Sequence, residues 1–261
     1  MVEKKNNAWQ PWLLFLISAA LFTVGWLMKS FPIFIFFAFA PLFTIADQAK
    51  ENDDFWVHTE FILLALFTAF FASSAFNSNH LIAAIVQAIA FTVAFLGYSF
   101  AYSSLGSRLG KFTIVFFWLG LEYILLKLPW RNESIFLADA VALKTSWLSW
   151  TAYTGYLGAS LWILCTGLFL YLAFFKDSIN FTWLALTLIL IIAPIVVSYF
   201  ISEAGINRNE MISLYAQGSS ATSRYIKQGE LIPRTAGWIS IVILLLAFVK
   251  TQTGKNESII S

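Results

Sequence analysis

An acidic side chain stands inside one of the most apolar stretches of the chain. Glu122 lies in "FFWLGLEYILLKLPW", with Lys127 five residues further on. An acid within a membrane helix is energetically expensive, and it usually has a partner or faces a cavity. Two interpretations stay open: Glu122 is a polar anchor inside a substrate-lined cavity, or it is a hydrogen-bonded residue that holds a helix bundle together. Lys127 lies nearer the helix end, so its side chain either reaches back toward Glu122 or extends outward to the membrane surface.

The other residue types that support covalent or metal chemistry are few and scattered. The single cysteine, Cys165, lies in the apolar run "LWILCTGLFLYLAFF", where a thiol is usually an inert small hydrophobic group. His58 and His80 have no second histidine at the spacing of metal ligands. The sequence contains no Gly-x-Ser-x-Gly motif, no paired carboxylates and no glycine-rich phosphate loop. We therefore predict no catalytic residue, no metal site and no cofactor.

The composition indicates a membrane protein. Of the 261 residues, 59% are hydrophobic and 11% are charged, whereas about 25% are charged in ordinary globular proteins. The 27 Phe and 11 Trp residues provide more aromatic surface than a soluble core of this size would bury. The 16 basic residues are scattered singly and form no patch, which argues against a nucleic-acid partner.

Eight apolar stretches approach the roughly 20 residues that a helix needs to cross a membrane. They are Trp12–Met28, Pro32–Ala46, Phe61–Phe76, Leu81–Tyr102, Phe112–Leu128, Tyr153–Phe175, Phe181–Ile201 and Gly237–Val249. We therefore predict an all-α polytopic membrane protein with about eight transmembrane helices. Residues 1–201 would form a seven-helix bundle, 202–236 an extracytoplasmic loop, and 237–261 the last helix and a cytoplasmic tail. Pro194 is expected to kink the seventh helix.

The distribution of Lys and Arg favours a cytoplasmic N-terminus. Lys4 and Lys5 precede the first helix, and Arg108 and Lys111 lie in a short loop on the same side. The total numbers of basic residues on the two sides are equal, so the orientation rests on these four. With an even number of spans, the C-terminus is then cytoplasmic as well.

Residues 129–150, "PWRNESIFLADAVALKTSWLSW", are neither long enough nor apolar enough to span a membrane. The stretch is amphipathic, and Trp130, Trp147 and Trp150 suit a membrane–water interface. We expect it to lie along the outer boundary of the membrane. Gly155 and Gly158 follow in "TGYLGAS", where small residues let another backbone approach closely.

Four stretches together resemble one family. They are "FPIFIFFAFAPLF" (Phe31–Phe43), "LEYILLKLPW" (Leu121–Trp130), "WLSWTAYTGYLGASLWIL" (Trp147–Leu164) and the stretch Tyr225–Lys250. In this order they resemble membrane segments of apolipoprotein N-acyltransferase, and the Thr-Gly-x-x-Gly-x-Ser-Leu spacing of the third is the most specific match. The resemblance covers nearly the whole chain.

This resemblance implies a bacterial inner-membrane protein related to enzymes that acylate the N-terminal cysteine of lipoproteins with an acyl group from a phospholipid. In the family, a Glu-Lys-Cys triad lies in a large nitrilase-like domain between the seventh and eighth helices. Here only Ser202–Ala236 occupies that position, and it contains no cysteine and no Trp-Pro-Glu motif. Ser149 and Ala152 also depart from the Gln and the acid that family members tend to have. We carry over no catalytic residue.

The favoured hypothesis is therefore a catalytically incomplete membrane protein that binds lipid or lipoprotein in lipoprotein maturation, or that supports a separate hydrolase-like chain. Membrane phospholipid is the expected partner. The candidate binding residues are Glu122, Lys127, Trp130, Trp147, Trp150, Gly155, Gly158 and Ser160. Two alternatives stay open: an N-acyltransferase that is active by itself, and a small membrane transporter.

Overall fold

The structure is a computed structural model, and it describes residues 10–28, 31–51, 55–106, 110–176, 179–217 and 230–260. These residues form helices and turns, and no strand occurs among them. The longer helices are α1 (Pro11–Leu27), α2 (Phe34–Glu51), α3 (Phe55–Ser73), α4 (Leu81–Leu105), α6 (Thr113–Lys127), α8 (Gly158–Phe174), α9 (Phe181–Phe200), α10 (Arg208–Gln217) and α12 (Leu231–Ile260). The short elements are η1 (Ser78–His80), η2 (Leu137–Ala140), η3 (Thr145–Trp147) and α7 (Thr151–Thr154).

Four helices of the described residues are long and apolar enough to cross a membrane, so the prediction of about eight spans is wrong. These four cover Phe55–Ser73, Ser78–Leu105, Phe181–Phe200 and Leu231–Thr253. Three further apolar helices, Pro11–Leu27, Phe34–Ala49 and Gly158–Phe174, are shorter. The reason is length, because a helix of 17 residues rises only about 26 Å, against roughly 30 Å of hydrocarbon. The chain is thus an all-α protein with several helices that suit a membrane.

The boundaries of three predicted segments also differ from the structure. The last helix begins at Leu231 and continues to Ile260, so the predicted tail is largely helical. The predicted loop over residues 202–236 contains helix α10 and the first turns of α12. The third helix begins at Phe55, which places His58 in a helix with a buried side chain.

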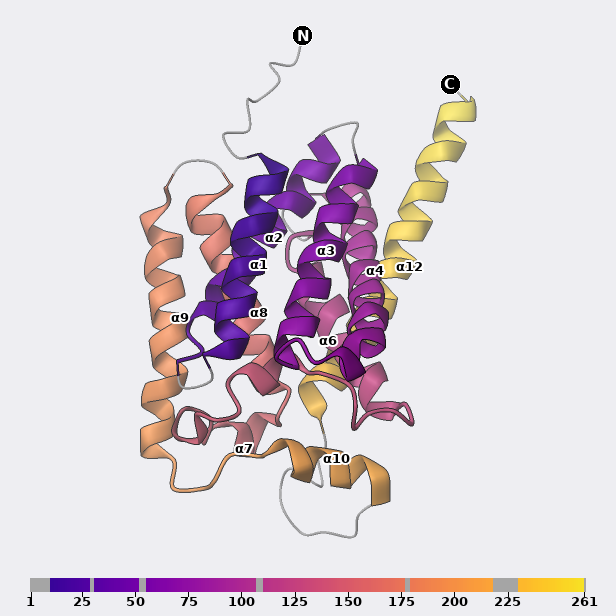
Figure 1. Ribbon diagram of the computed structural model, residues 1–261. Helices are drawn as coiled ribbons and strands as arrows, with labels where there is room; N and C mark the ends of the chain where they lie inside the picture. The colour runs from indigo at the N-terminus through magenta and orange to yellow at the C-terminus, as the bar shows by residue number, and fades with distance from the viewer. Residues whose placement is uncertain are drawn as a thin grey trace.

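Helix α2 lies at the centre of the bundle, packed against α1, α3 and α8 (Figure 1). Ring contacts hold it there: Phe39 meets Phe22 of α1 at 5.0 Å and Trp118 of α6 at 5.1 Å between ring centres. A Cβ placed on Gly167 of α8 would lie 2.6 Å from the Cβ of Phe39, so only glycine permits this approach. Because neighbouring helices rather than lipid surround α2, it does not need the full length of a spanning helix.

Pro194 leaves one backbone carbonyl of α9 without its helical donor, and a side chain from α8 supplies the replacement. Proline has no N–H, so the carbonyl of Leu190 four residues earlier cannot be bonded within the helix. The indole Nε1 of Trp162 donates to that oxygen at 2.6 Å. The proline that was expected to kink the helix therefore also creates the hydrogen bond that joins α9 to α8.

The two ends of the bundle differ in what they carry. The start of α1 and the end of α12 lie at the same end, and η2, α7 and α10 lie at the other (Figure 1). This arrangement agrees with two chain ends on one side of a membrane. Which side is cytoplasmic stays a prediction from the Lys and Arg distribution.

Candidate functional site

Residues 134–141 lie at the end of the bundle that carries α7 and α10 and form no α-helix, and their centre is buried. Phe136, Ala138 and Val141 have no exposed surface. The position of this stretch along the membrane boundary stays a prediction, but its centre is covered by other parts of the protein. Its flanks do reach the surface, since Trp130 is 53% exposed and Leu143 is 67% exposed. The apolar residues of the stretch pack inward because their backbone finds hydrogen-bond partners there.

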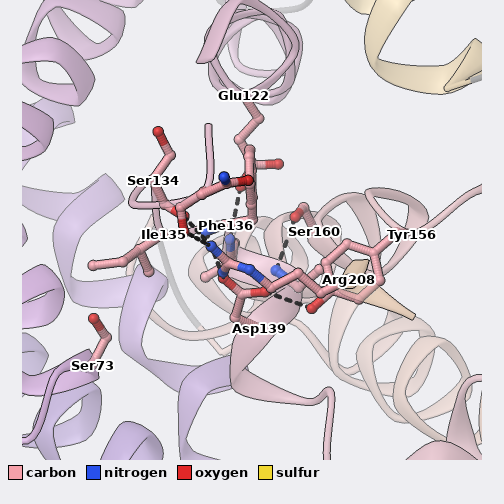
Figure 2. A network of polar contacts seen from close by, with 12 residues as sticks. Ser73, Glu122, Ser134, Ile135, Phe136, Asp139, Tyr156, Ser160 and Arg208 are labelled. Atoms are coloured by element: carbon pink, nitrogen blue, oxygen red, sulfur yellow. Dashed lines mark hydrogen bonds and ion pairs between the residues drawn. The ribbon is translucent and has the colours of Figure 1, made fainter. Parts of the chain in front are cut away.

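Four consecutive backbone N–H groups of this stretch each donate to a side chain, and Figure 2 shows the acceptors Glu122, Asp139 and Ser160. The N–H of Ile135 donates to Gln87 of α4 at 3.1 Å, and the Gln87 amide returns a bond to the Ile135 carbonyl at 3.0 Å. The N–H of Phe136 donates to Asp139 at 2.9 Å. The remaining two acceptors come from α6 and α8.

The other two acceptors are Glu122 of α6 and Ser160 of α8. Glu122 is fully buried, and its Oε1 accepts the N–H of Leu137 at 2.8 Å and the indole Nε1–H of Trp118 at 3.2 Å. The hydroxyl oxygen of Ser160 accepts the N–H of Ala138 at 3.0 Å. The second carboxyl oxygen of Glu122 is buried and has no hydrogen-bond partner. Of the two interpretations of Glu122, these contacts support the structural one.

Asp139 lies between Arg208 and the hydroxyl of Tyr156, so it links three parts of the chain (Figure 2). Arg208, at the start of α10, forms an ion pair with Asp139 and also donates to the carbonyls of Asn132 at 2.9 Å and Ser134 at 2.7 Å. The guanidinium carbon lies 5.5 Å from the centre of the Phe136 ring. One arginine thereby fastens α10 to the buried stretch.

Burial and the neighbouring groups act in opposite directions on the pKa of Asp139. Burial raises the pKa of Asp139 above its ordinary value, and the charge of Arg208 and the hydrogen bond from Tyr156 act against that rise. Burial, followed by the nearby charge of Asp139, raises the pKa of Tyr156 well above its ordinary value. The phenol therefore stays protonated and remains a donor to Asp139.

The residues before α10 are held against the same end of the bundle. A Cβ on Gly205 would lie 2.2 Å from the carbonyl oxygen of Leu148, so the two backbones touch there. The N–H of Ile206 donates to the hydroxyl of Thr151 at 2.9 Å. At the start of α12, the buried Glu230 accepts the N–H of Tyr156 at 3.0 Å. The described parts of residues 202–236 are thus anchored to the residues that precede α8.

The candidate binding residues take different places in the structure. The structure brings Glu122 and Ser160 together, but both hold the backbone of the 137–138 turn. Lys127 extends outward, with its Nζ 5.4 Å from the centre of the Tyr123 ring. Trp130 lies beyond the end of α6 and lines a hollow of about 570 Å³ against the first half of α4.

The remaining candidates shape the turns before α8. The indole of Trp150 donates to the carbonyl of Trp147 at 2.9 Å. Gly155 has a φ of +86°, in the region that favours glycine, and it ends the short helix α7. A Cβ on Gly158 would lie 2.5 Å from the hydroxyl of Thr154, so this glycine makes room for side chains of the preceding turns and not, as expected, for another backbone.

A larger pocket, of about 770 Å³, lies between α4, α6 and α12. Its walls are mainly apolar, and Gly97, Gly120 and Gly237 leave room on three different helices. Arg234 and Trp238 of α12 also line it. The sequence analysis missed this pocket, and the signal that points to it is the presence of small residues on three apolar helices.

No catalytic arrangement emerges from the described residues. Cys165 lies partly buried in the apolar helix α8. Within those residues, no group of three His, Cys, Asp or Glu side chains is placed to hold a metal ion.

Comparisons with protein-family models, with curated proteins and with solved structures found no match for this chain. The resemblance to apolipoprotein N-acyltransferase therefore stays a prediction from the sequence motifs.

The role of Glu122 can be tested with a pair of substitutions. Glu122→Gln keeps an acceptor for the N–H groups of Leu137 and Trp118, whereas Glu122→Leu leaves both buried donors unpaired. We expect Glu122→Leu to lower the free energy of unfolding by roughly 1–3 kcal/mol and Glu122→Gln to cost less. Unfolding in detergent micelles measures both. Equal losses in the two variants would mean that the ionised carboxylate itself is required.

The contact between Arg208 and Asp139 leads to a second prediction. Because the two side chains are in direct contact, the effects of Arg208→Gln and Asp139→Asn should not add, with a coupling of roughly 0.5–3 kcal/mol in a double-mutant cycle. Arg208→Gln should also speed hydrogen exchange of the backbone N–H groups in α10, and Lys144→Gln at the same end should not. Additive effects, with unchanged exchange, would contradict the proposed anchoring.

Proposed function

We propose that this protein is an apolipoprotein N-acyltransferase-like integral membrane protein that binds a lipid and has no catalytic activity of its own. Its place would be the bacterial inner membrane, with both chain ends in the cytoplasm, and its role would lie in lipoprotein maturation. The sequence motifs suggest the family and the location. The structure contributes the observation on which the binding role rests.

That observation is the pocket between α4, α6 and α12. Its volume of about 770 Å³ falls within the roughly 300–1,000 Å³ of typical ligand sites. The walls contributed by Val93, Phe117, Ile241 and Leu244 are apolar, so they suit a hydrocarbon chain. Two of the helices, α4 and α12, are among those long and apolar enough to cross a membrane, which supports lipid as the medium around the pocket.

The hydrogen bonds of the polar side chains inside the described bundle support the incomplete-enzyme part of the proposal. The polar groups Glu122, Asp139, Tyr156 and Ser160 are each bonded to backbone or to another side chain. The thiol of Cys165 lies further along α8, among apolar residues. These groups stabilise the fold and do not form a nucleophile with an adjacent base.

The short segment Ser202–Ala236, at the position of the family's nitrilase-like domain, suggests a separate hydrolase-like chain as a partner. It would contact the end of the bundle that carries α7 and α10. Leu143 and Tyr153 are 67% and 48% exposed there, and aromatic and aliphatic side chains of this kind contribute to protein interfaces.

The binding role predicts retention of lipid without chemistry. The purified protein, mixed with phospholipid and a diacylglyceryl-cysteine lipopeptide in micelles, should retain lipid in native mass spectrometry and leave the lipopeptide mass unchanged. A gain of one acyl chain would show an active enzyme, and Cys165→Ser would then test the single thiol.

A matched pair of variants tests the pocket itself. A Cβ on Gly237 meets its nearest atoms at 3.9 and 4.0 Å, so Gly237→Ala fits and serves as the control. Gly237→Phe should fill the space and lower lipid retention at least tenfold. Unchanged retention in Gly237→Phe would show that lipid binds elsewhere and would remove the observation behind the proposal.

A further inference from the structure

The pocket between α4, α6 and α12 is apolar along its length and cationic at one end. Among the described residues that line it, Arg234 is the only charged side chain. Arg234 is exposed and lies in the first turn of α12, which begins at Leu231. That turn is at the end of the bundle that carries α10 and η2 (Figure 1). A ligand in the pocket would therefore have its charged group at this end.

The depth of the pocket matches one leaflet of a bilayer. On α12 the lining residues continue from Arg234 through Gly237 and Ile241 to Leu244. Ten residues of helix rise about 15 Å, which is half of the roughly 30 Å hydrocarbon thickness. A lipid chain that enters beside Arg234 would then reach the middle of the membrane.

A second cation lies beside the mouth of the pocket. Tyr123 lines the pocket, and the Nζ of Lys127 lies 5.4 Å from the centre of its ring. The acid that precedes Arg234 by one turn, Glu230, is buried and accepts the N–H of Tyr156. No acidic side chain of the described residues lines the pocket. Arg234 thus gives the described lining of the pocket a positive charge at this end.

We infer that this pocket binds a lipid with an anionic phosphate headgroup, whose chain lies along the pocket and whose phosphate meets Arg234 and Lys127. The inference rests on the proposed lipid-binding role and adds the chemical class of the ligand. A guanidinium binds phosphate through two parallel hydrogen bonds, so Arg234 supplies geometry as well as charge. Tyr123 and Trp238 present amphipathic rings that suit the same depth.

The test compares two lipids with identical chains. Full-length protein in detergent micelles is titrated with phosphatidylglycerol or phosphatidylcholine, and retention is measured by native mass spectrometry. The wild-type protein should retain phosphatidylglycerol at least fivefold better. Arg234→Gln should bring the ratio close to one, mainly by loss of the anionic lipid, and Arg234→Lys should give an intermediate ratio because the charge stays and the paired bonds are lost.

Lys144→Gln is the matched control, because it removes a cation at the same end of the protein from a residue that does not line the pocket. The ratio should not change in this variant. A selectivity that survives Arg234→Gln, or that is lost equally in Lys144→Gln, would overturn the assignment to Arg234.

A second probe separates phosphate recognition from recognition of a whole glycerolipid. An alkyl phosphate should displace bound phosphatidylglycerol, whereas the alcohol of the same chain length should not. Failure of the alkyl phosphate to compete would overturn the inference.

The outcomes distinguish this inference from the proposed function. Equal retention of both lipids by the wild-type protein would overturn the inference and leave lipid binding in place. Retention of neither lipid would overturn the proposed function itself.

Discussion

Backbone N–H groups inside an apolar bundle have no water to bond with, and each one left unpaired costs several kcal/mol in a membrane. Helices meet this constraint internally, but residues 134–141 are not α-helical and are nonetheless buried. The structure therefore depends on side chains that accept hydrogen bonds from the backbone N–H groups of this stretch. Gln87, Glu122 and Ser160 each accept from this stretch, and they stand on α4, α6 and α8. The stretch thereby joins three helices that are otherwise connected mainly through apolar contacts.

The same constraint explains two further features. The indole of Trp162 donates a hydrogen bond to the carbonyl that Pro194 frees in α9. The Arg208 guanidinium donates to the carbonyls of Asn132 and Ser134. In each case a polar side chain from another element replaces a missing backbone partner. These bonds fix α9 to α8, and α10 to the end of the bundle. The proposed binding pocket lies on the other face of α6, where Gly120 and Gly237 bring two helices together. Mainly apolar side chains of α4, α6 and α12 line the pocket on that face.

Sequence reasoning found the helices, because apolar runs mark them directly, and it singled out Glu122 because an acid is rare in such a run. It overestimated the number of spanning helices, since α1, α2 and α8 are apolar but short. It did not foresee that the centre of residues 129–150 is buried, because the hydrogen-bond partners are distant in sequence: Gln87 and Ile135 are 48 residues apart. It also missed the Arg208–Asp139 pair, whose members are 69 residues apart. Neither contact leaves a local pattern, so only the packed structure reveals them.

The burial of this stretch is open to a direct measurement. In a Cys165→Ser background, single cysteines replace Ala138, which has no exposed surface, and Leu143, which is 67% exposed. A water-soluble maleimide is then applied to the protein in micelles, before and after denaturation. The structure predicts rapid labelling at position 143 and labelling at position 138 only after denaturation. Equal labelling rates in the folded protein would place the stretch at the surface and contradict the account.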